Sequence, residues 1–151
     1  MKYLLFMIAL VASSVVLKAQ TAEDSVKIAV NRLFDGMKSG DATAISSAFA
    51  DSAILQSVGL DRKTGKLQIE NEAVNDFADF VSKQPKGAVD EQIKFDVIKV
   101  DGQLAIVWAP YKFYFKGVFS HCGVDSFQLI KNSNEWKIQY LIDTRRRIGC
   151  E

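Results

Sequence analysis

The hydrophobic pattern divides the chain into a first half with helical spacing and a second half with alternation. Over residues 21–38, apolar side chains recur every three or four positions, which predicts a long amphipathic helix ended by Gly40. Asp41 is placed to cap a short second helix. A third helix is expected over residues 70–82, because apolar residues at helical spacing form one face there, and it should end before Pro85.

Beyond Pro85, apolar and polar residues alternate, which is typical of half-buried β-strands. Asp101-Gly102 and the polar residues 132–134 supply turns between neighbouring strands. One further short strand is expected before the third helix, over residues 52–58, with a loop over 59–65 after it. The four strands expected after Pro85 are 92–100, 103–115, 120–131 and 136–142.

Pro110 lies inside the strand expected over residues 103–115. Proline donates no backbone hydrogen bond, so it is best tolerated at a sheet edge or a bulge. A bulge at Pro110 would switch the face that the following side chains use. The pattern therefore leaves open which face these residues occupy.

The order of elements is helix, helix, strand, helix and then four antiparallel strands, which indicates an α+β fold. We expect one strongly curved, cone-shaped antiparallel β-sheet packed against about three N-terminal helices. A chain of 151 residues is of single-domain length, and we assign residues 22–151 to one domain.

Residues 1–19 have the layout of a secretory signal peptide. An early lysine is followed by an apolar run over residues 3–12 and then by small residues, with cleavage expected after Ala19. Ser13 and Ser14 interrupt the apolar run, which is short of the roughly 20 residues that span a membrane. We therefore expect a secreted or periplasmic protein with no stable membrane anchor after cleavage.

Charge and residue counts exclude several classes of function. The formal net charge is +1, and loss of Lys2 and Lys18 with the leader would change it to −1, which gives no basis for binding nucleic acid. A single histidine and two cysteines offer no metal-ligand cluster, and phosphate-loop, dinucleotide and nucleophile-elbow motifs are missing. We expect neither a metal nor a cofactor.

The helices followed by VWAPYKFYFKG, SHCGVDSFQLI, EWKIQYLIDTRRR and a final Gly-Cys resemble the nuclear transport factor 2-like superfamily. Within it, the chain is similar to the exported bacterial branch labelled SnoaL-like or "putative lumazine-binding". The resemblance covers residues 22–151 and implies a cystatin-like cone with a cavity between sheet and helices. The superfamily includes steroid isomerases, polyketide cyclases, dehydratases and proteins that only bind a ligand or a partner, so activity must be argued from the pocket.

Cys122 and Cys150 make a disulfide the leading interpretation for an exported protein. The alternative is a reactive thiol at Cys122, activated by the neighbouring His121. Adjacent side chains on a strand point to opposite faces, which disfavours that alternative.

His121 and Asp125 lie on one face of their strand, about 13 Å apart at roughly 3.3 Å per residue. They are too far apart for a direct hydrogen bond but could line one elongated pocket. His121 could instead bond a loop at a strand end. Asp125 could face solvent, pair with Arg145 or Arg147, or lie in a functional cavity with a shifted pKa.

Other candidate ligand contacts come from polar aromatics and from the arginine run near the C-terminus. Most of residues 145–147 should form a solvated edge, with Arg145 as the inward exception. Aromatic residues between positions 108 and 119 should fill the concave face of the sheet. The full set of predicted ligand-binding residues is Gln56, Trp108, Tyr111, Tyr114, His121, Asp125 and Arg145.

The leading hypothesis is an exported protein that binds a small apolar or aromatic molecule in a hydrophobic, aromatic-lined pocket. An alternative is an isomerase-, cyclase- or dehydratase-type enzyme that uses Asp125 or His121 as general base. In that case Tyr114 or Trp108 would hold an enolate-like oxygen. A third hypothesis is a homodimeric interaction module that uses the open face of the sheet. The sequence specifies neither the ligand nor a reaction.

Overall fold

The computed structural model describes residues 21–61 and 63–150. The predicted leader, residues 1–19, lies outside the described residues. In the described part, helices and strands follow one another as α1 (Ala22–Ser39), α2 (Ala42–Ala48), β1 (Phe49–Leu60), β2 (Leu67–Glu72), α3 (Val74–Ser82), β3 (Val89–Ile93), β4 (Val97–Asp101), β5 (Leu104–Phe115), β6 (Val118–Asn132) and β7 (Glu135–Thr144).

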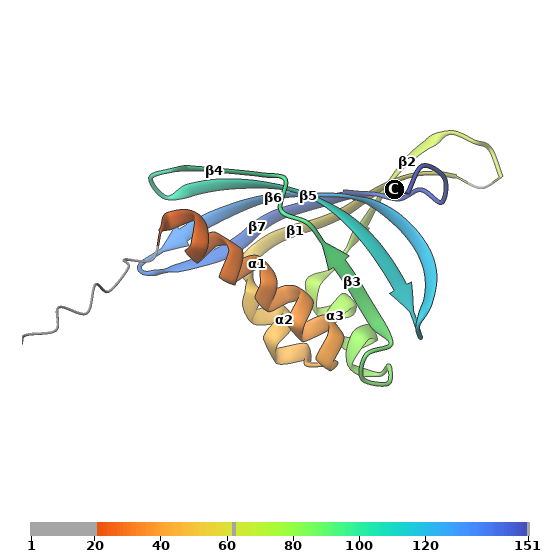
Figure 1. The fold of residues 1–151 in the computed structure, drawn as a ribbon, viewed down its shortest axis with the longest axis horizontal. Helices are drawn as coiled ribbons and strands as arrows, with labels where there is room; N and C mark the ends of the chain where they lie inside the picture. Colours follow the sequence, from red (N-terminus) through yellow and green to blue (C-terminus); the bar gives the residue numbers. More distant parts are fainter. Residues whose placement is uncertain (1–20, 62, 151) are drawn as a thin grey trace, which may run out of the picture.

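The strands form one sheet with the order β2-β1-β7-β6-β5-β3, in which β4 also pairs with β5. The helices lie together on one side of this arched sheet (Figure 1). The α+β class is therefore confirmed. The sheet is mixed rather than wholly antiparallel, because β1 runs parallel to β7 with Leu55 opposite Leu141. That pairing joins the first and last strands of the fold, and local alternation carries no information about it.

Helix α1 begins and ends where the sequence predicts. Thr21 caps its N-terminus and accepts a hydrogen bond from the backbone of Asp24, whose side chain accepts one in return. Gly40 ends the helix in the left-handed conformation that glycine adopts most easily. The helix buries the predicted face, with Val26, Val30, Leu33, Phe34 and Met37 in the core.

The segment between the second and third helices differs from the prediction. Residues 67–72 form strand β2, whereas the prediction assigned no element to residues 67–69 and the start of the third helix to residues 70–72. Helix α3 begins only at Val74. All six residues of β2 are exposed, so its sequence has no buried face to produce alternation. Pairing with β1, as between Val58 and Ile69, defines this strand.

The strand predicted over residues 92–100 is divided into β3 and β4, and the division explains how Pro110 is accommodated. Lys94 N donates to Pro110 O (2.9 Å) and Asp96 N donates to Trp108 O (3.1 Å). Residues 94–96, between β3 and β4, therefore lie opposite only residues 109–110 of β5. The nitrogen of Pro110, which carries no hydrogen to donate, faces the break between β3 and β4. The pairing of Pro110 with Val124 of β6 is therefore undisturbed. Alternation therefore continues through Pro110, and no switch of face occurs there.

The core fills the space between the sheet and the helices. Phe127 and Leu129 of β6 and Ile138 of β7 are completely buried. The ring of Phe34 from α1 meets Phe127 edge to face, with ring centroids 6.2 Å apart. This contact anchors the first helix to the middle of the sheet.

Candidate functional site

A cavity of about 390 Å³ lies between the concave face of the sheet and the helices. All the residues that α1 and α3 contribute to it are apolar, whereas its polar side chains come from the strands and from the chain just after β7. The lining consists of Leu33, Phe34, Met37, Leu55, Glu72, Phe77, Phe80, Val89, Glu91, Tyr111, Phe113, Phe115, Ser120, His121, Asp125, Leu141, Asp143 and Arg145.

Strand alternation places the polar side chains at the cavity. On β5 every second residue, including Tyr111 and Phe113, points inward. The neighbouring strands present their own inward positions at the same level, with Tyr111 opposite Gly123 and Ala109 opposite Asp125. Asp125 in turn lies opposite Asp143 of β7, so β5, β6 and β7 place polar side chains at one level of the cavity.

Asp143 is the centre of a completed hydrogen-bond network. The Tyr111 hydroxyl lies 3.0 Å from Asp143 Oδ2 and 2.9 Å from the carbonyl oxygen of Thr144, and Arg145 Nε donates to the same Oδ2 at 2.9 Å. Ser57 Oγ donates to the other carboxylate oxygen. Burial and the charge of Asp143 raise the pKa of Tyr111, so its hydroxyl stays a donor. Both oxygens of Asp143 are therefore engaged within the protein.

Glu91 and Asp125 form a second, incomplete group. Asp125 is only 2% exposed, and its Oδ2 atom is buried without a hydrogen-bond partner among the described residues. Burial raises the pKa of Asp125 well above its usual range, and the adjacent Glu91 raises it further. Burial also raises the pKa of Glu91 to about 7. Two ionised carboxylates can only accept hydrogen bonds, so a hydrogen bond between the Glu91 and Asp125 side chains requires a proton on one of them.

His121 lies at the rim of the same polar region. Its Nδ1 is 3.0 Å from Ser120 Oγ, and its ring packs against Tyr111 and Phe113 with centroids 5.7 Å and 4.9 Å away. Desolvation lowers the pKa of His121, and the nearby charge of Arg145 lowers it further. The imidazole is therefore neutral near pH 7. His121 and Asp125 line one cavity, as the strand pattern predicts.

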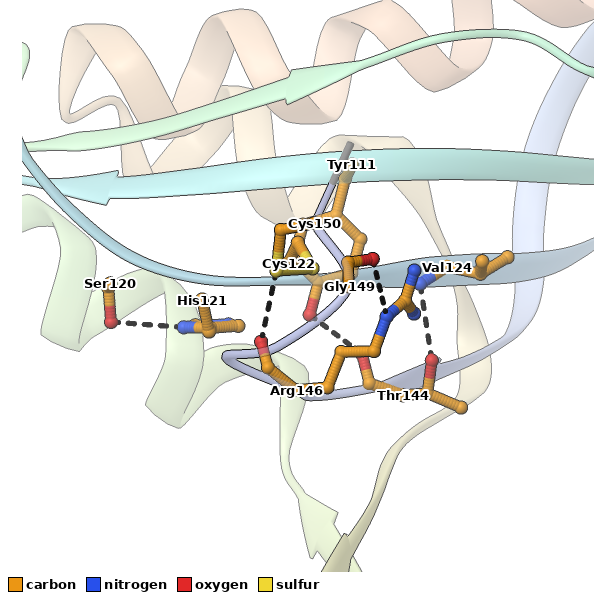
Figure 2. Close-up of a disulfide and its surroundings, with 9 residues drawn as sticks. All are labelled: Tyr111, Ser120, His121, Cys122, Val124, Thr144, Arg146, Gly149 and Cys150. Atoms are coloured by element: carbon orange, nitrogen blue, oxygen red, sulfur yellow. Dashed lines mark hydrogen bonds between the residues drawn. A yellow bond between two sulfur atoms is a disulfide. The ribbon is translucent and has the colours of Figure 1, made fainter.

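Cys122 and Cys150 form the predicted disulfide, which is drawn in Figure 2. Cys122 also exchanges two backbone hydrogen bonds with Arg146, at 2.9 and 2.8 Å. These bonds hold the chain after β7 against β6, which keeps Arg145 at the cavity. A free thiol beside His121 is excluded, because both cysteines of the chain are paired. A disulfide also suggests an oxidising compartment.

Gly123 is a structural requirement of the site that sequence reasoning missed. A Cβ atom at this position would lie 1.7 Å from the carbonyl oxygen of Thr144 and 2.7 Å from the ring of Tyr111. The absence of a side chain lets the end of β7 approach β6 closely enough for the Tyr111 hydroxyl to reach Thr144 (Figure 2).

Four of the predicted ligand-binding residues line the cavity, namely Tyr111, His121, Asp125 and Arg145. The other three lie elsewhere. Trp108 occupies an outward position of β5 and is 46% exposed, whereas Tyr114 packs against Phe119, with ring centroids 5.8 Å apart. Gln56 bonds Tyr140 and Asn71 at 2.7 Å each. Strand alternation explains why Trp108 points outward, because the buried positions of β5 are 105, 107, 109 and 111.

Several polar residues of the cavity were not predicted. Glu72, Glu91 and Asp143 line it together with Asp125. Simple alternation along β7 places Asp143 on the same face as positions 137, 139 and 141, which the sequence pattern indicates to be the outer face. In the structure, Leu141 and Asp143 are both buried. The register shift between β6 and β7 at Gln128/Leu129 accounts for the altered parity. Glu91 could have been found only from its long-range pairing with Phe113.

Residues 21–140 match the family model described as "Putative lumazine-binding". The chain belongs to this family. A comparison with curated protein sequences found no match. Among the described residues, no group of three or more histidine, cysteine or acidic side chains is arranged to hold a metal ion. No helix within the described ranges is long and apolar enough to cross a membrane.

Solved structures similar to this member of the family share its fold. An NTF2-like protein from Shewanella baltica has a TM-score of 0.62 and 17% identity, over 82% of this chain and 93% of that one. One from Methylobacillus flagellatus has a TM-score of 0.61 and 20% identity, over 82% and 91%. A cystatin-like protein from Nostoc punctiforme has a TM-score of 0.63 and 12% identity, over 83% and 93%. The expected nuclear transport factor 2-like fold is thereby confirmed, and at these identities the likeness extends to the fold alone.

Proposed function

We propose that this family member binds a small, partly aromatic or apolar molecule in the cavity between its sheet and its helices. The observation that carries the proposal is the cavity itself. Its volume of about 390 Å³ falls within the roughly 300–1,000 Å³ of ligand sites, and six aromatic rings and a few convergent polar groups line it. The description of the family as lumazine-binding supports a small-molecule ligand.

Native mass spectrometry of the mature protein, followed by identification of the small molecules it releases, tests this function. Leu55 lines the cavity, so Leu55→Trp should fill part of it and reduce the amount of released ligand. Ile54→Trp is the matched control, because Ile54 is 50% exposed and lies on the other face of β1. Equal ligand recovery from wild type and Leu55→Trp would contradict binding in this cavity.

We also propose export, with cleavage after Ala19. The hydrophobic leader supports it, and the disulfide agrees with an oxidising compartment. N-terminal sequencing of the protein from a culture fractionated into cytoplasm, periplasm and medium tests both statements. A cytoplasmic protein that retains Met1 would contradict them.

The Glu91–Asp125 pair favours a second candidate function, an enzyme of isomerase, cyclase or dehydratase type. A general base works best with a pKa near the working pH, and burial raises the pKa of Glu91 to about 7. In this mechanism Glu91 removes a proton beside a carbonyl, while the protonated Asp125 donates a hydrogen bond to the developing oxyanion. The structure thus favours Glu91 as base over Asp125 or His121.

Exchange of the α-protons of 2-tetralone in deuterated water, followed by NMR, tests proton abstraction directly. Wild type should accelerate exchange, with a rate that rises as pH increases through about 7. Glu91→Gln should abolish the acceleration, whereas His121→Gln should leave most of it. An exchange rate equal to that in buffer alone would exclude this candidate for simple ketones.

A third proposal is a homodimer formed through the outer face of the sheet. Exposed apolar residues lie opposite one another there, with Val97 paired to Trp108 and Leu104 paired to Ile130. Such a patch marks an interaction surface in many soluble proteins. Light scattering on the mature protein should show a dimer that Trp108→Glu converts to a monomer. A wild-type protein that is monomeric at high micromolar concentration would exclude it.

A further inference from the structure

The polar part of the cavity contains one acceptor group that the protein itself leaves unfilled. Asp143 receives hydrogen bonds from Ser57, Tyr111 and Arg145. The buried Oδ2 of Asp125 receives none among the described residues, and the group beside it is another carboxyl, that of Glu91. A buried polar atom without a partner is costly, so this position favours a ligand that brings a donor to it.

The charge of the lining decides what kind of donor fits. Four carboxyl groups line the cavity, against one guanidinium, and that guanidinium, of Arg145, is already bonded to Asp143. His121 is neutral near pH 7, because desolvation lowers its pKa. With one proton on the pair, the region still carries net negative charge. A bound anion would be repelled there, whereas a bound cation would be attracted.

The remaining wall of the cavity suits the rest of such a ligand. Phe34, Phe77 and Phe80 from the helices and Phe113 and Phe115 from β5 present aromatic rings to the cavity. Rings of this kind bind an apolar body, and their faces also attract a positively charged group. The cavity thus combines the carboxyl groups of Glu91 and Asp125 with a lining of aromatic side chains.

We propose that the ligand of this cavity is an apolar molecule that carries a protonated amine or amidine, and that this cation lies between the carboxyl groups of Glu91 and Asp125. Its N–H groups would donate to both side chains, including the unpartnered Oδ2 of Asp125. The apolar body would pack against α1 and α3. This inference rests on the proposed binding function and specifies its ligand class.

Binding of the cation should release a proton. The ammonium group takes the place of the proton that the pair holds, and that proton passes to the buffer. Amine affinity should therefore rise from pH 5.5 to pH 8, because Glu91 ionises near pH 7 and the cation then displaces the one proton that the pair still holds. The titratable and charged groups that face the pair are Glu72 from β2, Tyr111 from β5, His121 from β6, Asp143 from β7 and Arg145 just after it.

Tryptamine, tryptophol and indole-3-propionate are suitable probes, because they share an indole ring and differ in the charge of the side chain. We expect titration calorimetry of the mature wild-type protein at pH 8 to show at least ten-fold tighter binding of tryptamine than of tryptophol. Indole-3-propionate should bind more weakly than either. The ten-fold preference should decrease at pH 5.5, and paired buffers of different ionisation enthalpy should reveal about one proton released per tryptamine at pH 8.

Variants of the pair separate this inference from a general effect of charge. Asp125→Asn and Glu91→Gln should each reduce the preference for tryptamine over tryptophol by at least five-fold while leaving tryptophol binding in place. Asp90→Asn is the matched control, because Asp90 precedes Glu91 on β3 but lies outside the cavity lining and pairs with Lys38. It should leave the preference unchanged.

Equal binding of the three probes would overturn the cation site while leaving the proposed function intact. A preference for tryptamine that survives both Asp125→Asn and Glu91→Gln would also overturn it. Failure of tryptamine to bind overturns the inference whatever the other probes do. If Leu55→Trp also released the same small molecules as wild type, the proposed function itself would fail.

Discussion

Glu91→Gln should make the folded protein more stable at neutral pH, although it removes a charged side chain. In the folded state, burial raises the pKa of Glu91 from an ordinary 4.5 to about 7. Between these values the folded protein holds a proton that the unfolded chain releases. The free energy of unfolding therefore falls as pH rises through this window.

The size of the effect follows from the shift. Each pKa unit corresponds to about 1.4 kcal/mol, so the change in Glu91 corresponds to about 3 kcal/mol of stability lost between pH 4 and pH 8. Glutamine is isosteric and neutral throughout, so the variant avoids this loss. It should resemble wild type near pH 4 and be about 3 kcal/mol more stable near pH 8.

Urea unfolding at intervals from pH 4 to pH 8, with the disulfide intact, measures this difference. The denaturation midpoint should change while the m-value stays constant. Asp90→Asn is the control. Its carboxyl has a pKa lowered by a hydrogen bond from Gln92, so its removal should not flatten the decline. If wild type and Glu91→Gln lose equal stability between pH 4 and pH 8, the burial of an ionisable Glu91 is refuted.

Three further changes test the framework around the site. The Cys122–Cys150 disulfide closes a loop with a sequence separation of 28, so its removal should destabilise the protein by roughly 3–4 kcal/mol. Thermal melts with and without reductant measure this effect, and identical melting temperatures would contradict it. Gly123→Ala should lower the free energy of unfolding by about 3 kcal/mol, because the added Cβ would overlap a backbone carbonyl oxygen. Gly59→Ala is the control in the same urea assay and should change it little, because the space around Gly59 is open. Phe127→Ala should cost about 3–5 kcal/mol of unfolding free energy, since this ring is completely buried, and a loss under 1 kcal/mol would contradict its place in the core.

The local pattern of the chain was sufficient for its helices and for most of its strands. Apolar spacing and the following Gly40 were sufficient to predict α1, because helix ends depend on groups within a few residues. Strand alternation likewise put His121 and Asp125 on one face and Cys122 on the other. The family model that matches residues 21–140 of this chain agrees with the family resemblance seen in the sequence.

Tertiary structure decided the features that depend on which strands become neighbours. β2 has no buried face, so only its pairing with β1 identifies it. The inward turn of Asp143 requires the register shift between β6 and β7. Trp108 faces outward because the break between β3 and β4 accommodates Pro110 without a bulge in β5.

The polar groups of the cavity show the same division between sequence and tertiary structure. An aspartate at position 125 on an apolar strand already indicated a costly burial or a special role, because a carboxylate is rarely buried without a partner. What the sequence could not supply was the neighbour, Glu91, which β3 brings from 34 residues away. Periodicity specifies the face on which a side chain lies, whereas the meeting of the Glu91 and Asp125 carboxyl groups depends on strand pairings that only the folded sheet establishes.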